Sequence, residues 1–255
     1  MIFFINIPTD KKLTIVTDIH GEEDIFQEYL NLWNPYDKDD IIIFTGDLIH
    51  HTVKECDGSL EILDTVKEYI EYPNFFVLLG NHEHSQLYGE DVYKYGVNQC
   101  DLFRELVEDK YPNQYIVKYN EYKSLLSRFE YFATTSNSIF ISHTGIHEDY
   151  LPSILKGDVD IYELSMDYDF ERELITECLW SRPYDDYTSE TIDCFLNYMG
   201  LKYSICGHTT YNPYHILGNQ LILDNSIYDS KRYIQFNTST EFNDIMELVD
   251  CIFKL

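Results

Sequence analysis

The chain has 255 residues, enough to bury one large core, and we expect a single domain over residues 1–255. Hydrophobic residues make up 44% of the sequence and charged residues 25%, which excludes a disordered or fibrous protein. The 45 acidic residues outnumber the 18 basic ones, and the resulting formal charge of −27 argues against long nucleic acids and anionic membranes as partners.

The sequence also carries no signal for export or membrane insertion. No run approaches the roughly 20 apolar residues of a membrane span, and the apolar residues 1–5 are too few and lack a basic flank for a signal peptide. The six cysteines are scattered without a CxxC pair, so we expect free thiols rather than a disulfide framework or a zinc ribbon. These features predict an intracellular, cytoplasmic protein.

Hydrophobic patterning predicts the elements in chain order. Short runs rich in Ile, Val and Phe predict buried strands at 13–17, 41–44, 75–79, 139–142 and 203–206. Amphipathic patterns predict helices over 25–33 and 60–70, the second capped by Ser59. Late antiparallel strands are expected at 221–223 and 233–236, a closing helix over 241–255, and a small, partly helical lobe over the core from residues 91–132. Apolar strands alternating with helices indicate an α/β fold whose sheets are covered on both sides.

Polar side chains that bind metals follow each of the five predicted strands. In chain order these are Asp18-Ile19-His20-Gly21, Gly46-Asp47, Gly80-Asn81-His82-Glu83, Ser142-His143 and Gly207-His208. Strand ends on one edge of a sheet are where sites form, so we expect the five loops to converge. Each motif alone is weak, but all five in this order, each with a glycine nearby that gives room for close backbone approach, form a strong joint signal.

The spacing of these residues suits two metal ions. Asp18 and His20, two residues apart on an extended segment, face the same side, as two ligands of one ion must. Asp47 has two carboxylate oxygens and can bridge two ions about 3.5–4 Å apart, the spacing of two-metal phosphoryl chemistry. Asn81, His143 and His208 would complete the second ion.

The motif series resembles that of calcineurin-like metallophosphoesterases and, more narrowly, the bacterial and phage-like branch of the phosphoprotein (Ser/Thr) phosphatase family. The glycine after His20, the glutamate after His82 and the segment Leu179–Pro183 carry the narrower resemblance, and the match runs from about residue 13 to 226. The resemblance implies a central two-sheet β-sandwich flanked by helices, with a dinuclear metal site at the strand ends. It also implies two divalent ions, manganese above all, with iron and zinc as the alternative.

The same resemblance assigns roles. Asp18, His20 and Asp47 would hold one ion, and Asp47, Asn81, His143 and His208 the other, with Asn81 also contacting substrate. A metal-bridging hydroxide would attack phosphorus, His82 would protonate the leaving group as general acid, and Arg182 would grip phosphate. The chemistry agrees, because imidazole titrates near pH 7 and a guanidinium pairs with two phosphate oxygens at once.

One loop departs from the family pattern. The family continues its second motif as Gly-Asp-x-x-Asp-Arg-Gly, whereas this chain reads Gly46-Asp47-Leu48-Ile49-His50-His51-Thr52. His50 and His51 therefore stand where a carboxylate orients the catalytic histidine and an arginine holds phosphate. We expect either that His51 contacts phosphate when it is protonated or that both side chains point into solvent or pack on the loop.

The remaining polar candidates lie outside the motif positions. We expect His84, His147 and His215 to be structural or to lie at the rim of the site. The segment Asp224-Asn225-Ser226 is expected to back the site without a catalytic role.

Three functions compete on this reading. The leading hypothesis is a metal-dependent phosphatase acting on a phosphoserine or phosphothreonine protein or peptide. The altered loop motivates the alternative, hydrolysis of a small nucleotide such as a dinucleoside polyphosphate or a cyclic or terminal nucleotide phosphate. A degenerate metal-binding scaffold without catalysis ranks last, since all six predicted ligands are present.

Overall fold

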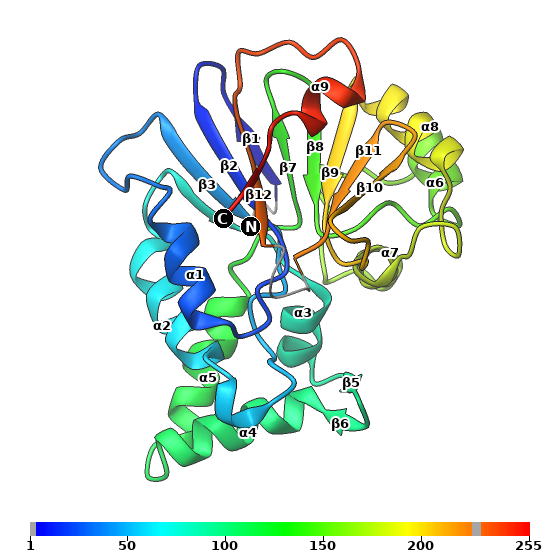
Figure 1. Ribbon diagram of the computed structural model, residues 1–255. Coiled ribbons are helices and arrows are strands. Elements are labelled where there is room, and N and C mark those ends of the chain that lie inside the picture. Colours follow the sequence, from blue (N-terminus) through cyan, green and yellow to red (C-terminus); the bar gives the residue numbers. More distant parts are fainter. Residues whose placement is uncertain (1–3, 226–230) are drawn as a thin grey trace.

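Two large β-sheets lie face to face in the computed structural model, which describes residues 4–225 and 231–255 (Figure 1). Among these residues, six strands form one sheet in the order β1 (Phe4–Ile7), β7 (Phe132–Thr135), β8 (Ile139–Ser142), β9 (Tyr203–Cys206), β11 (Gln220–Leu223) and β10 (Tyr214–Leu217). The other sheet, counted over the same residues, has the order β13 (Ile252–Lys254), β12 (Arg232–Asn237), β2 (Lys12–Val16), β3 (Asp40–Phe44) and β4 (Phe75–Val77).

Successive residues of a strand pack on opposite sides of its sheet. On β3, Ile41 and Ile43 belong to the apolar cluster between the two sheets. Ile42 and Phe44 belong to the cluster under the helices, where the Phe44 ring lies 5.0 Å from that of Phe26. Because side chains alternate between faces, a strand covered on both sides must be apolar throughout, as this one is.

Helices cover the outer faces of both sheets (Figure 1). Beside the five-stranded sheet lie α1 (Glu23–Leu30) and α2 (Ser59–Tyr69), and beside the six-stranded sheet lie α6 (Leu151–Lys156), α7 (Asp169–Trp180) and α8 (Ser189–Met199). At the end of the sandwich where the strands β2, β3 and β4 finish, α3 (Asn81–Tyr88) packs on α5 (Tyr115–Leu126), which packs on α4 (Gln99–Lys110). In the described part of the chain, no helix is both long and apolar enough to cross a bilayer.

The predicted α/β architecture of two sheets flanked by helices is confirmed, and each of the five predicted strands is present. The segment 91–132 contains the short hairpin β5 (Tyr93–Lys94) and β6 (Val97–Asn98), the helices α4 and α5, and the start of β7. This segment packs on α2 and α3.

Two local expectations are wrong, and the expectation that residues 221–223 form an antiparallel strand holds for one of its two neighbours. Ser59 is the first residue of α2 rather than its cap, and its hydroxyl accepts a hydrogen bond from the His50 backbone at 2.8 Å instead. The predicted closing helix is limited to α9 (Ile245–Val249), because Ile252–Lys254 form β13 and satisfy the free edge of β12. The strand β11 is antiparallel to β10 but parallel to β9. The predicted Ser226 lies outside the described residues.

Candidate active site

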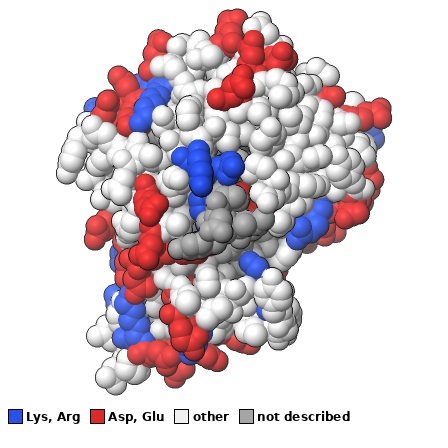
Figure 2. Space-filling model, in the orientation of Figure 1, with Lys and Arg blue, Asp and Glu red and all other residues white. Residues whose placement is uncertain are grey.

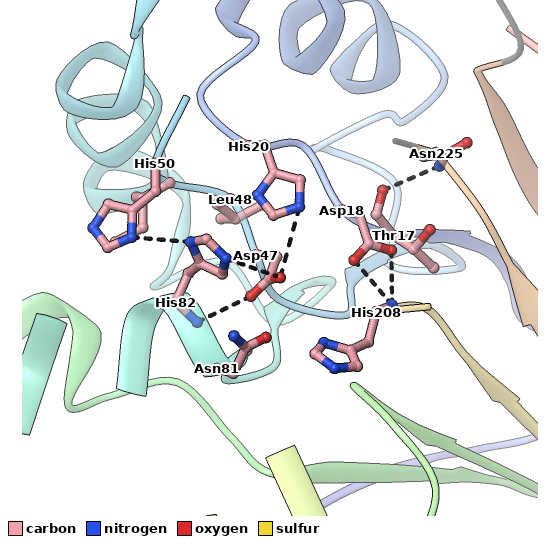
Figure 3. A network of polar contacts seen from close by, with 12 residues as sticks. Thr17, Asp18, His20, Asp47, Leu48, His50, Asn81, His82, His208 and Asn225 are labelled. Carbon is pink, nitrogen blue, oxygen red and sulfur yellow. Dashed lines mark hydrogen bonds and ion pairs between the residues drawn. The ribbon is translucent and has the colours of Figure 1, made fainter. Parts of the chain in front are cut away.

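The candidate ligands come together where five strands end (Figure 3). Asp18 and His20 follow β2, Asp47 follows β3, and Asn81 begins α3 after β4. His143 comes directly after β8, and His208 lies two residues beyond β9. The strands β2, β3 and β4 run parallel in one sheet, as do β8 and β9 in the other, so their carboxyl ends deliver these loops to one edge of the sandwich.

Asp47 lies at the centre of this group. Its Oδ2 is 3.8 Å from His20 Nε2 and 4.0 Å from His82 Nε2, while its Oδ1 is 3.5 Å from His143 Nε2. The carboxylate is buried, and Oδ1 also accepts a hydrogen bond from the His82 backbone N–H at 3.1 Å. Asp47 thus belongs to two sets of possible ligands, one with His20 and His82 and the other with His143 and His208. Its two oxygens face different sets, as a carboxylate that bridges two cations must.

The second set consists of electron-pair donors that face one another. The His143 ring lies with Nδ1 2.9 Å from the Thr45 carbonyl oxygen, to which Nδ1 donates, so Nε2 carries a lone pair. This Nε2 lies 2.9 Å from Asn81 Oδ1 and 3.2 Å from His208 Nδ1. The lone pairs of Asn81 Oδ1 and His143 Nε2 repel at this distance unless a cation lies near both, and nitrogen and oxygen donors together suit a divalent transition metal.

Unsatisfied imidazole nitrogens support the same interpretation. His20 Nδ1 and His208 Nε2 are buried without a hydrogen-bond partner among the described residues. Burial lowers the pKa of both histidines well below the ordinary value, which keeps both rings in the neutral form that binds metals. Burial also raises the pKa of the Asp47 carboxyl, so the ionised carboxylate needs a positive charge nearby. The residues present therefore fit two metal ions.

Asp18 lies beside the two sets rather than within either. Its carboxylate oxygens accept the His208 backbone N–H at 3.0 and 3.2 Å, and the residue lines the same cavity as His20 and Asp47. Burial raises the pKa of Asp18, and the nearby Asp47 carboxylate adds to the rise. His82, expected as a general acid, lies close enough to His20 and Asp47 to belong to their set. The ligand role of Asp18 stays a prediction.

The backbone of the site adopts unusual conformations. Positive φ angles occur at Asp18 (47°), His20 (48°), Asp47 (54°), His50 (75°) and His208 (68°). Such left-handed residues each cost on the order of 1–2 kcal/mol and collect at functional sites. Close approach adds a second constraint at two glycines: a Cβ on Gly80 would collide with the Asp47 carboxylate, and one on Gly207 with the Asp18 carboxylate.

The Glu83 carboxylate joins the loop after β3 to the loop after β4 through hydrogen bonds. Its buried carboxylate accepts the backbone N–H groups of Asp47 at 2.8 Å, Leu48 at 2.7 Å, Ile49 at 3.2 Å and Gly80 at 3.1 Å. One side chain at the start of α3 therefore holds the loop after β3. The sequence marks Glu83 only as a family feature and gives no sign of this clamp.

The two histidines of the altered loop point to different places. His50 is buried, and its ring contacts those of His82 and Phe103; the expectation that it points into solvent is wrong. His51 Nδ1 accepts the Val53 backbone N–H at 3.1 Å, and the residue lines a separate acidic hollow with Glu55 and Asp57. The structure does not bring His51 to the cavity that holds Asp47.

That cavity has a volume of about 520 Å³ and is lined by the candidate ligands Asp18, His20, Asp47, Asn81 and His208, together with His82, Arg182, Trp180 and others. Arg182, the predicted phosphate contact, lines this cavity, and its contact with phosphate stays a prediction. The hairpin β5–β6 adds Tyr93 and Lys94 to the wall, and neither was singled out from the sequence.

The remaining candidates lie outside the cavity or behind it. His84 Nδ1 lies 3.4 Å from Glu90, His147 lies 3.9 Å from Asp186, and the His215 ring stacks on that of Tyr211 at 4.3 Å. Asn225 donates to the Thr17 carbonyl at 3.1 Å and so supports the loop after β2 (Figure 3).

Solved structures that superimpose on the chain include two protein phosphatases and one protein described as a "putative diadenosine tetraphosphatase". A protein serine/threonine phosphatase from Saccharomyces cerevisiae with similarity to human phosphatase PP5 superimposes with a TM-score of 0.68 at 15% identity, over 99% of this chain and 82% of that one. The cold-active protein-tyrosine phosphatase of the psychrophile Shewanella sp. gives 0.60 at 18% identity, over 91% and 77%. A structure described as that of a "putative diadenosine tetraphosphatase" gives 0.54 at 16% identity, over 100% and 98%.

At these identities the structural matches establish the fold alone, and no curated protein sequence is significantly similar to the chain. The sequence model of the calcineurin-like phosphoesterases, however, matches residues 11–211, which contain all six candidate metal ligands, His82 and Arg182. Of these residues, His20, His82 and His143 have a ring nitrogen within 4.0 Å of the Asp47 carboxylate. The chain belongs to the calcineurin-like phosphoesterase family.

Proposed function

We propose that the protein is a metal-dependent phosphomonoesterase of the serine/threonine phosphatase type, acting on a phosphorylated protein or peptide. The observation that carries the proposal is Asp47, whose two oxygens face separate sets of imidazoles at 3.5 to 4.0 Å. The proposed substrate class is that of the yeast serine/threonine phosphatase, which shares the fold over 99% of this chain.

The chain offers ligands for two ions. Asp18, His20 and Asp47 would hold one, and Asp47, Asn81, His143 and His208 the other; we propose manganese, with iron and zinc as the alternative. When bound, two divalent cations would lower the pKa of a water and stabilise the charge that develops on phosphorus. The buried, neutral imidazoles keep the lone pairs available for this role.

Two further side chains act on the substrate in this proposal. His82 lies within the cavity wall and would deliver a proton to the leaving oxygen. Arg182 would pair with phosphate oxygens, since its guanidinium matches two of them at once. Asn81 lines the same wall, whereas His51 faces the other hollow and contributes to phosphate binding only if the loop moves.

A second candidate is hydrolysis of a small nucleotide, such as a dinucleoside polyphosphate. The structure described as a diadenosine tetraphosphatase matches over 98% of its length. In addition, Tyr93 and Tyr95 line the cavity and are 64% and 92% exposed, so their rings are available for stacking on a base.

Parallel assays with one preparation separate the candidates. The manganese-loaded protein is tested on a phosphoserine peptide, diadenosine tetraphosphate and an aryl phosphate, with Asp47→Asn as the inactive control. Faster hydrolysis of the peptide supports a protein phosphatase, and faster hydrolysis of the dinucleotide supports the second candidate. If no phosphoester is hydrolysed, both are refuted.

We also propose that the protein works in the cytoplasm. All six cysteines are free, among them the buried Cys100, Cys178 and Cys206, which suits a reducing compartment.

A further inference from the structure

Lys94 is a basic residue in the wall of the active-site cavity that the family motifs do not contain. Together with Arg182 it supplies the Lys and Arg side chains among the described residues that line this cavity. Neither the Lys94 ammonium nor the Arg182 guanidinium has an ion pair or a side-chain hydrogen bond among the described residues, whereas the nearby Lys231 is paired with Glu22 at 2.7 Å.

The hairpin β5–β6 positions Lys94 in the wall of the cavity. Tyr93 pairs with Asn98 and Lys94 with Val97, so Tyr95 and Gly96 form a two-residue turn. Both turn residues have positive φ, 52° and 80°, as a tight hairpin turn of this length requires. Lys94 therefore lies directly beside the turn, at the tip of the hairpin.

The base of the hairpin is fixed to α4. Asn98 donates to Asp91 Oδ1 at 2.7 Å, and its own Oδ1 accepts the Cys100 N–H at 3.1 Å, which caps the helix. The Gln99 N–H donates to the Val92 carbonyl at 2.8 Å. Val92 is buried and lines the cavity itself, so the base of the hairpin lies beside the site, while Tyr93 and Tyr95 are largely exposed.

The positive charge of Lys94 affects the pKa of Asp47, at the centre of the site. Burial raises the pKa of Asp47, and the positive charges of Lys94 and Arg182 both act against that rise. Burial lowers the pKa of Lys94 itself, although the Asp47 and Asp18 carboxylates oppose this. A partly buried ammonium that faces a cavity and has no ion pair is available for an anionic ligand.

Two basic side chains in one cavity contrast with the acidic surface of the molecule. On the face in Figure 2, acidic side chains lie along most of the edge and at the lower end of the molecule, and basic side chains are fewer. In a chain with a formal charge of −27, basic groups kept unpaired in one cavity indicate that the cavity receives a negatively charged group.

We propose that Lys94 binds the phosphate group of the substrate from the side of the hairpin, as a second cationic contact beside Arg182. The ammonium acts as a point charge on phosphate oxygens, while the planar guanidinium fixes their orientation. This inference rests on the proposed phosphoesterase function, but it concerns phosphate binding and not the chemical step.

Calorimetric titration of the manganese-loaded protein with inorganic phosphate tests the inference. We expect Lys94→Met to bind phosphate about 10- to 100-fold more weakly, because a hydrogen bond to a charged group is lost. Lys94→Arg keeps the charge and should stay within about threefold of the parent protein. Lys156→Met, which removes an exposed lysine at the end of α6, is the matched control and should bind like the parent.

The outcomes separate this inference from the proposed function. Equal phosphate affinity of Lys94→Met and the parent, or no phosphate binding by the parent, would overturn the role of Lys94. Phosphate binding that depends on Lys94 without hydrolysis of any phosphoester would uphold this role and refute the proposed function. Thermal unfolding of each variant, compared with that of the parent, shows that a weaker affinity does not come from misfolding.

Discussion

The imidazole rings of His50 and His82 face each other through their Nδ1 atoms, which lie 3.0 Å apart (Figure 3). Gln86 fixes which of the two donates: its Nε2 donates to the Tyr119 hydroxyl at 2.8 Å, so its Oε1 accepts from His50 Nε2 at 3.1 Å. His50 Nδ1 is then an acceptor, and His82 Nδ1–H is the donor. His82 is thereby held with Nε2 toward Asp47 and free to exchange a proton in the cavity.

We expect His50→Phe to lower kcat about 10- to 100-fold with little change in KM, the range found when a group that orients a catalytic ligand is removed. Phenylalanine fills the buried space but leaves His82 Nδ1–H without an acceptor. Steady-state kinetics on an alkyl and an aryl phosphate checks this, and the alkyl ester should lose more. His50→Asp supplies a new acceptor and should recover much of the loss; equal kcat in all three proteins would contradict the orienting role.

Burial of His50 also makes the stability depend on pH. Burial lowers the pKa of His50 to about 3, whereas an unfolded histidine titrates near about 6.5. Between these values the unfolded chain binds more protons, so the free energy of unfolding is highest above about pH 6.5 and falls as the pH drops. We expect His50→Asn to reduce this slope by about 1.4 kcal/mol per pH unit. Urea unfolding in the presence of a chelator measures it, and an unchanged slope would show that His50 is protonated in the fold.

His82→Asn should lower kcat by about 10²–10³ on a serine or other alkyl phosphate, the range for loss of a general acid. An aryl leaving group needs little protonation, so aryl phosphates should lose much less. Kinetics on the two substrate types gives the comparison. Equal losses on both would indicate that His82 binds or positions the substrate instead of donating a proton.

Asp47→Asn should abolish activity more completely than the loss of any single terminal ligand. The amide keeps the shape but removes the charge that faces both sets of imidazoles. Elemental analysis after dialysis should find less metal in Asp47→Asn than in His208→Asn. Two tightly bound ions with near-normal turnover in Asp47→Asn would refute the two-metal assignment.

Glu83→Gln should reduce the free energy of unfolding by about 2–4 kcal/mol, because the amide places its own N–H₂ group against backbone donors. Three of these donors are the consecutive N–H groups of Asp47, Leu48 and Ile49. Urea denaturation measures the loss. Glu68→Gln, an exposed change on α2, is the matched control and should stay within about 0.5 kcal/mol of the parent.

The strands and the residues that follow them could be predicted because two sequence signals agree: a continuous apolar run and a polar motif shortly after it. A run such as Ile41–Phe44 is apolar at every position, which indicates burial on both faces, and Gly46-Asp47 follows it after one residue. Parallel strands then place their ends on one edge. The site follows from local patterns and one rule of topology.

The position of His50 could not be predicted in the same way. Its burial depends on Ser59 accepting its backbone N–H and on Gln86 and Phe103, which come from three different helices. The position of Lys94 could not be predicted either, because it depends on how the start of α4 holds a short hairpin. The strand β13 was missed because pairing with β12, and not local propensity, decides its conformation.

The left-handed backbone at Asp18, His20 and Asp47 restricts how this site can change over evolutionary time. Aspartate, asparagine and histidine tolerate positive φ better than other residues with a side chain, and glycine tolerates it best. A residue at these positions must therefore meet two requirements: it must supply the ligand atom, and it must tolerate a positive φ. A descendant that loses catalysis should keep its fold most easily by acquiring asparagine or glycine there, so these two residues at positions 18 and 47 would mark an inactive relative.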